Sequence, residues 1–274
     1  MPATYAHFRA GETVRRRVDT EAQRVICAYP ELYEIGLHGP DILFYYQPLS
    51  SNRVNRVGYA MHEKSGASFF AYAAKVLKNH GGRDAYLAYI YGFLSHFALD
   101  VRCHGLIAEK MTRSGLSHAE VEVELDRELL SLDGFEPTRK KLTGHIVPSH
   151  KNAEVIEAFY PGISADEVRH ALRGFVRYND LLRAPNALKR QALYAAFRLA
   201  KCDKTMHGMV IRSQADPRCA DSTDQLLGLY AEGERLAVRL IGEYGAYLRG
   251  EAPLDEIFRF NFESQLPGGK ETAL

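Results

Sequence analysis

The sequence predicts an all-α protein, built as one multi-helix domain over residues 1–274. Apolar residues recur at helical spacing along most of the chain, and strand-like alternation is nearly absent. Pairs such as Pro-Gly, Ala-Pro and Asp-Gly interrupt this pattern at points where helices would end. With 46% hydrophobic residues, the chain has enough apolar side chains to bury one sizeable core.

The individual helices follow from local patterns. The segment 84–103 is apolar on most of its faces, which is typical of a helix in the centre of a bundle. The stretch 65–79 is amphipathic and stops before two glycines. A helix is expected over 117–132, because Ser117 and Glu120 have the spacing of a capping box. Further helices are predicted over 151–160, 164–182, 186–211 and 221–250.

Two segments do not follow this pattern. Residues 24–29 fit either a short strand or the end of a helix. Residues 38–55 are rich in Pro, Ser, Asn and Tyr, which indicates an irregular loop. Loops of this length inside compact domains are often functional.

The charged residues exclude several classes of protein. Lys and Arg number 35 against 34 Asp and Glu, which gives a formal net charge of +1. This balance, together with the apolar content, excludes a mainly disordered chain. It provides no overall attraction for nucleic acid, and the basic runs 15–17 and 139–141 are short enough to be solvated helix faces. Nucleic acid is therefore not an expected partner.

Several features of the sequence predict the cellular compartment of the protein. No run of about 18 apolar residues occurs, so no transmembrane segment is expected. The N-terminal residues lack the charged start and apolar run of a secretory signal. No CxxC pair is present, and free thiols are expected at Cys27, Cys103, Cys202 and Cys219. These features predict a cytoplasmic protein, and they do not indicate its oligomeric state.

The histidines cluster near the N-terminus, with seven of the eleven in the first 118 residues. His96, Asp100 and His104 follow at four-residue spacing, which places them on one face of the apolar helix. His118 and Glu122 repeat this spacing on the next helix. A buried aspartate is costly unless it is paired or bound to a metal, and His/carboxylate pairs on facing helices commonly build metal sites. The pattern predicts a metal site that suits zinc, with iron or manganese left open.

Taken in order, these residues resemble the zinc-dependent phospholipase C family and, more distantly, the S1/P1-type nucleases. The resemblance covers roughly residues 1–150 and implies an all-helical fold that residues 151–274 complete with further helices. His38-Gly39-Pro40-Asp41 and Met61-His62 are weak motifs alone, and Asp41 in its Gly-Pro-Asp run also fits a plain turn. The matching pieces are Tyr5-Ala6-His7, His38-Gly39-Pro40-Asp41, Met61-His62, the run from His96 through Asp100 to His104, and His118 with Glu122.

The resemblance implies a cluster of zinc ions. Secreted members use an N-terminal tryptophan to hold the third ion, whereas this sequence contains no tryptophan. Two or three zinc ions per chain are therefore expected, and His38 is not a ligand in this assignment. The implied ligands are Asp41, His62, His96 and Asp100 for one zinc, His104, His118 and Glu122 for a second, and His7 with the bridging Asp100 for a third.

The resemblance further implies hydrolysis of a phosphodiester or phosphomonoester by metal-activated water, with Asp41 as the catalytic base. A phospholipid headgroup, a nucleotide and a small phosphoester all stay open as the substrate. An HD-type phosphohydrolase would need an adjacent His-Asp pair, which the sequence lacks. The remaining alternative is a non-catalytic protein, either a metal-stabilised helical scaffold or a module that binds lipid headgroups.

Overall fold

The computed structural model of the protein describes residues 3–81, 83–202 and 206–268. Within these ranges the chain is helical without any strand, apart from one isolated bridge between Ser65 and Asn261, so the all-α prediction is confirmed. None of the helices in these ranges is long and apolar enough to span a membrane. The elements are α1 (Thr4–Arg15), α2 (Thr20–Ala28), α3 (Pro30–Gly36), the 3-10 helix η1 (Gly39–Tyr45), α4 (Arg53–Glu63), α5 (Gly66–Asn79), α6 (Arg83–Ser114), α7 (His118–Leu132), α8 (His150–Glu157), α9 (Ala165–Leu182), α10 (Ala187–Leu199), the 3-10 helices η2 (His207–Met209) and η3 (Pro217–Cys219), α12 (Ala220–Arg249) and the 3-10 helix η4 (Glu256–Arg259).

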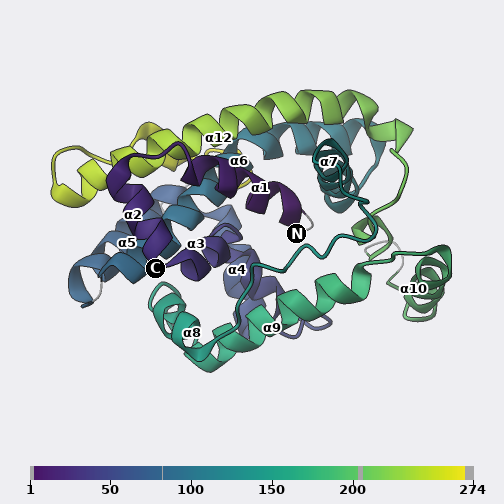
Figure 1. The fold of residues 1–274 in the computed structure, drawn as a ribbon, viewed down its shortest axis with the longest axis horizontal. Coiled ribbons are helices and arrows are strands. Elements are labelled where there is room, and N and C mark those ends of the chain that lie inside the picture. Colours follow the sequence, from purple (N-terminus) through teal and green to yellow (C-terminus); the bar gives the residue numbers. More distant parts are fainter. Residues whose placement is uncertain (1–2, 82, 203–205, 269–274) are drawn as a thin grey trace.

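The two longest helices, α6 and α12, lie side by side and run antiparallel (Figure 1). An ion pair joins Lys110 to Asp221 near one end, and Leu99 packs against Gly233 further along. Helices α1, α2, α3, α5 and α7 also contact α6. As a result, every residue of α6 from Leu87 to Val101 is buried, as the apolar character of this segment predicts.

The crossing of α3 and α6 depends on two glycines. A Cβ atom on Gly92 would collide with the carbonyl oxygen of Tyr33, and one on Gly36 would collide with that of Tyr89. The two backbones are therefore in direct contact at this point. This close approach lets α3 turn straight into η1, which carries one of the predicted metal ligands.

The structure decides one open alternative and corrects two expectations. Residues 24–29 belong to α2 and its C-terminus rather than to a strand. Most of 38–55 is ordered, because η1 buries Ile42, Leu43 and Phe44, and Asn52 caps α4. The helix expected over 186–211 ends at Leu199, after which Lys201 has a positive φ of 55° that no α-helix continues through.

We predict that Gly92→Ala lowers the free energy of unfolding by about 2 kcal/mol, because the new methyl group overpacks the crossing of α3 and α6. The melting temperature should fall by about 4–8 °C. Gly228→Ala on α12 is the matched control, since nothing lies within 4 Å of its added Cβ atom, and it should leave stability unchanged or raise it slightly. Equal stability of the two variants would contradict the direct backbone contact between α3 and α6 at Gly92.

Candidate metal centre

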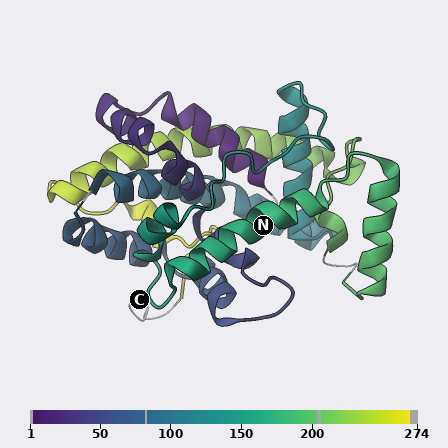
Figure 2. The same ribbon diagram turned by 60° about the horizontal axis from the view of Figure 1, so that its bottom comes forward.

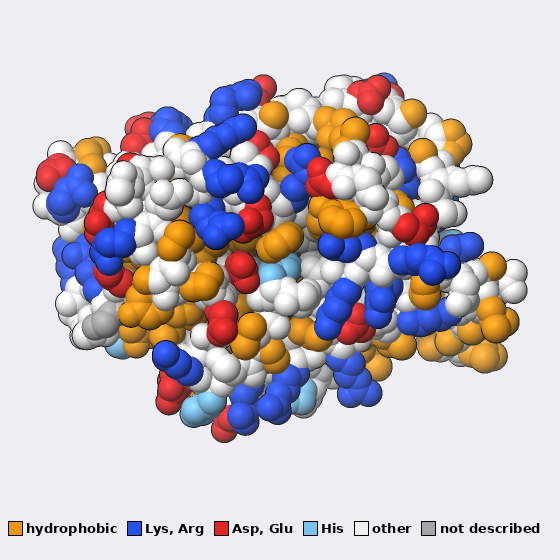
Figure 3. All heavy atoms as spheres, in the orientation of Figure 1, with side chains coloured by type: hydrophobic (Ala, Val, Ile, Leu, Met, Phe, Trp, Pro, Cys, Tyr) orange, Lys and Arg blue, Asp and Glu red, His pale blue; other side chains and the backbone are white. Residues whose placement is uncertain are grey.

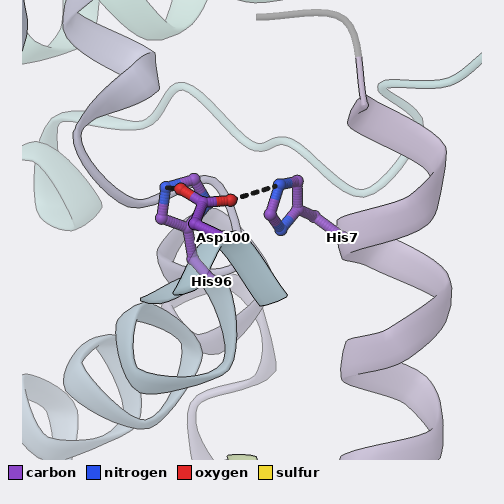
Figure 4. A group of neighbouring side chains, drawn as sticks. All are labelled: His7, His96 and Asp100. Carbon is purple, nitrogen blue, oxygen red and sulfur yellow. Dashed lines mark ion pairs between the residues drawn. The ribbon is translucent and has the colours of Figure 1, made fainter. Parts of the chain in front are cut away.

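The centre is organised around the carboxylate of Asp100, which is 2% exposed. Helix α6 places His96 one turn before it and His104 one turn after it. Oδ2 of Asp100 lies 3.0 Å from Nε2 of His96, and Oδ1 lies 3.6 Å from Nε2 of His104. His7, from α1, approaches from the other side with its Nε2 atom 3.4 Å from Oδ1 (Figure 4). One carboxylate thus faces three imidazoles.

A second group forms where α6 meets α7. Nε2 of His118 lies 3.2 Å from Oε1 of Glu122, and Nε2 of His104 lies 3.5 Å from the same oxygen. Helix α7 begins at His118 because Ser117 and Glu120 form the predicted capping box. The cap fixes the first turn of α7, and His118 and Glu122 therefore share the face turned toward His104.

A third group joins η1 to α4. Nε2 of His62 lies 3.0 Å from Oδ1 of Asp41. The other ring nitrogen of His62, Nδ1, donates a hydrogen bond to the carbonyl of Gly58 at 2.9 Å. In neutral His62 the lone pair of Nε2 therefore points at a carboxylate, which is unfavourable unless a cation lies between them. Gly39 has a φ of 46°, and a Cβ atom there would collide with the His96 ring, so this turn brings Asp41 close to α6.

Donor atoms in these groups fit divalent metal ions. The ligand atoms of each group lie within 4.8 Å of one another, as metal coordination requires. In the described part of the chain, several of these atoms are fully buried without a hydrogen-bond partner, which is costly without a cation. The three groups are His7, His96 and Asp100; Asp41, His62 and His96; and His104, His118 and Glu122. The unpartnered atoms are Nδ1 of His7, Oδ1 of Asp41, both ring nitrogens of His96, Oδ2 of Asp100 and Nδ1 of His104.

Protonation compensates only some of these groups. Burial would lower the pKa of His104, but Asp100 and Glu122 raise it to about 10. Burial, together with the nearby His96, lowers the pKa of His7 to about 4, so His7 is neutral at pH 7. Burial would raise the pKa of Glu122, but the charge of His118 and the hydrogen bonds of His104 and His118 lower it well below its ordinary value. The centre thus combines ionised carboxylates with at least one neutral imidazole, which is the donor set of zinc sites.

The centre is open at two places. The side chain of Asp41 is 15% exposed and that of His118 is 29% exposed, whereas those of His96 and Asp100 are 0% and 3% exposed. Solvent therefore reaches the groups of Asp41 and His118, while the middle of the centre is enclosed by protein.

The comparison with known families agrees with this geometry. Residues 6–168 match the family described as zinc dependent phospholipase C. The match covers more than half of the chain, and the chain therefore belongs to the zinc-dependent phospholipase C family. Comparison with curated proteins and with solved structures finds no match. The family and the three groups together support zinc binding.

All eight predicted ligands come together in the three groups: His7, Asp41, His62, His96, Asp100, His104, His118 and Glu122. His96 takes part in two groups, and Asp100 is close to His7 of α1 and to His96 and His104 of its own helix. The number of ions and the assignment of each ligand stay predictions.

Asp126, which positions α1, is not among the predicted site residues. Both oxygens of Asp126 accept hydrogen bonds from the first turn of α1, from the amide of Tyr5 at 3.1 Å and from that of Ala6 at 2.7 Å. Asp126 is fully buried, and burial raises its pKa to about 8. Its four-residue spacing from Glu122 was the available signal, but the acidic neighbours on α7 obscure it.

The C-terminal segment also reaches the centre. The ring of Phe262 lies 5.3 Å from that of His62 and 5.9 Å from that of His96. The hydroxyl of Ser264 contacts the carbonyl oxygens of Asp100 and Val101 at 3.1 and 2.8 Å. No motif in the sequence points to this segment, because its partners lie more than 150 residues away.

His38 is buried beside the centre, where its Nε2 atom lies 2.7 Å from Nε2 of His145. One ring must donate and the other accept in such a pair, so at least one is neutral. Burial lowers the pKa of both, that of His145 to about 3. The pair fastens the loop before α8 to the N-terminus of η1, and the expectation that His38 is not a ligand stays a prediction.

We predict that Asp126→Ala lowers the free energy of unfolding by about 2–3 kcal/mol, because two buried amides of α1 lose their acceptor. Zinc affinity should fall as well, since α1 carries His7. Asp133→Ala is the control: Asp133 also binds α1, through Tyr5 and Arg9, but it is partly exposed, so its loss should cost about 1 kcal/mol or less. Denaturant unfolding measures the free energy of unfolding of both variants. Equal losses of stability would refute the role of Asp126 in anchoring α1.

Proposed function

We propose that this protein is a zinc-dependent phosphoesterase that hydrolyses a phosphodiester. The observation that carries the proposal is the placement of three His/carboxylate groups around one buried aspartate in a chain of this family. Zinc bound there would polarise the phosphoryl oxygens, lower the pKa of a water molecule toward neutrality and stabilise the leaving oxygen.

The charges of the centre favour an anionic substrate. Asp41, Asp100 and Glu122 contribute three negative charges, whereas two divalent ions contribute four positive charges and three contribute six. The occupied centre is therefore cationic with either number of ions. A phosphodiester carries one negative charge and is attracted to it.

Asp41 is the proposed catalytic base. Its carboxylate lies at the open side of the centre. Burial alone would raise the pKa of Asp41, but the contact with His62 holds it well below the ordinary value, so the carboxylate is ionised. An ionised carboxylate at this opening accepts the proton of the attacking water and orients its oxygen toward phosphorus. Asp100, which is enclosed, positions His7, His96 and His104 and does not contact the substrate in this scheme.

A neighbouring cavity supports a substrate with an apolar part. Its volume is about 180 Å³, and it lies between η1, α7 and the C-terminal end of α9. Phe44 lines it and stacks on Tyr59 with ring centroids 4.3 Å apart, while the His62 ring lies 5.1 Å from Phe44. The cavity is thus separated from the metal centre by the side chain of Phe44 alone. We propose that it holds the apolar portion of the phosphoester, such as part of a phospholipid.

We predict that Asp41→Asn retains most of its zinc but loses about 10²–10⁴-fold in kcat, because the amide cannot accept the proton. Zinc content by plasma mass spectrometry and turnover of bis(p-nitrophenyl) phosphate measure the two effects. Asp166→Asn, which changes a 73% exposed carboxylate on α9, is the control and should behave as the wild type. Unaltered turnover in Asp41→Asn would remove Asp41 as the base.

Asp100→Asn should lose at least one zinc ion per chain together with nearly all activity, because one carboxylate faces the ligands of two groups. Asp216→Asn provides the matched control, since Asp216 is also buried but pairs with Arg212 and Arg218 outside the centre. Full zinc content in folded Asp100→Asn would overturn the bridging role.

The non-catalytic alternative has a distinct outcome in the same assays. A zinc-stabilised scaffold would bind zinc and gain thermal stability from it, yet it would hydrolyse no phosphoester. Zinc content of two or three ions per chain without turnover of any diester or monoester would favour that alternative.

A further inference from the structure

Helix α10 stands apart from the bundle at one end of the molecule (Figures 1 and 2). It contacts the rest of the protein through a small apolar cluster of its own, in which Leu193 and Phe197 pack with Ala184 and Val210. This cluster is separate from the two larger cores around α6. We call residues 181–202 the α10 arm.

The face of α10 opposite this cluster is also apolar, yet it is exposed. Leu188, Ala192, Ala195 and Leu199 follow at spacings of four, three and four, which aligns them in one stripe along the helix. Leu188 is 80% exposed and Leu199 is 86% exposed. A helix with an exposed apolar stripe in addition to its buried one indicates a surface that something else covers.

Cations border this stripe. The α10 arm contains five Lys and Arg residues and no Asp or Glu: Arg183, Lys189, Arg190, Arg198 and Lys201. Lys189 follows Leu188 and Arg198 precedes Leu199, so at about 100° per residue they flank the stripe on opposite sides. Lys189 also donates to the carbonyl of Asp180 at 3.2 Å, which holds its charge near the helix. Figure 3 shows hydrophobic side chains over α10 next to a group of Lys and Arg side chains.

We propose that the α10 arm docks on an anionic lipid surface. In this arrangement the leucine stripe enters the acyl boundary, and Lys189 and Arg198 extend sideways to the phosphates. A second copy of this chain fits less well, because a symmetric contact would place the cations of one arm against those of the other. The arm is continuous with the cavity beside the metal centre, since Leu182 and Arg183 line that cavity. Docking would therefore bring the cavity to the membrane.

The experiment measures co-sedimentation of the zinc-loaded full chain with vesicles. One set contains about 30 mol % phosphatidylglycerol in phosphatidylcholine, and the other contains phosphatidylcholine alone. We expect binding to the anionic vesicles that weakens as salt is raised. The double variant Leu188→Ser/Leu199→Ser and the double variant Lys189→Gln/Arg198→Gln should each bind about tenfold more weakly or worse.

Matched controls lie on other helices. Leu132→Ser removes a 60% exposed leucine from α7, and Arg113→Gln removes a 68% exposed cation from α6, and both should bind as the wild type. Asp41→Asn should bind as well, so that failure of the phosphoesterase proposal leaves this result unchanged. Equal melting temperatures would show that the arm variants are folded, as the exposure of Leu188, Arg198 and Leu199 leads us to expect.

Three results would overturn the proposal. The first is a wild type that binds neutral and anionic vesicles equally or binds neither, and the second is arm variants that bind as the wild type. The third is a concentration-dependent dimer, seen by analytical ultracentrifugation, that Leu188→Ser/Leu199→Ser abolishes while vesicles are not bound. That last result would assign the stripe to a contact between two copies of the chain.

Discussion

The structure depends on a carboxylate, that of Asp100, in the middle of the most apolar helix. An ionised side chain at 2% exposure is costly unless cations or hydrogen-bond donors surround it. Here the compensation comes from imidazoles, two on α6 itself and one from α1. Helix α6 can therefore be both the core of the bundle and the support of a polar centre, provided that the other ligands and their metal ions are in place.

The sequence predicts the part of this centre that is encoded locally. Four-residue spacing on a helix places His96, Asp100 and His104 on one face whatever the rest of the chain does, and the capping box sets the start of α7. The hydrogen bonds of Asp126 to α1 and the His38–His145 pair join segments more than 100 residues apart. No spacing rule connects such partners, because they are brought together only by the packing of whole helices.

The contrast between local patterns and long-range contacts also explains why residues 38–55 and the end of α10 were not predicted correctly. Composition indicates a loop over 38–55, but it does not reveal that η1 is held against α6 by the absence of a side chain at Gly39. Helical spacing likewise favours continuation beyond Leu199, whereas the backbone turns at Lys201. At both places a residue with a positive φ angle sets the direction of the chain, Gly39 before η1 and Lys201 after α10. Composition and helical spacing do not reveal such an angle.

The position of Phe262 and Ser264 has a consequence for biogenesis. All eight predicted ligands lie within residues 7–122, so they leave the ribosome long before the segment that covers them. Until residues 262–264 have been made, the chain lacks the side chain that packs against the rings of His62 and His96. Enclosure of the centre on this side therefore depends on residues 262–264, which are synthesised well after the predicted ligands.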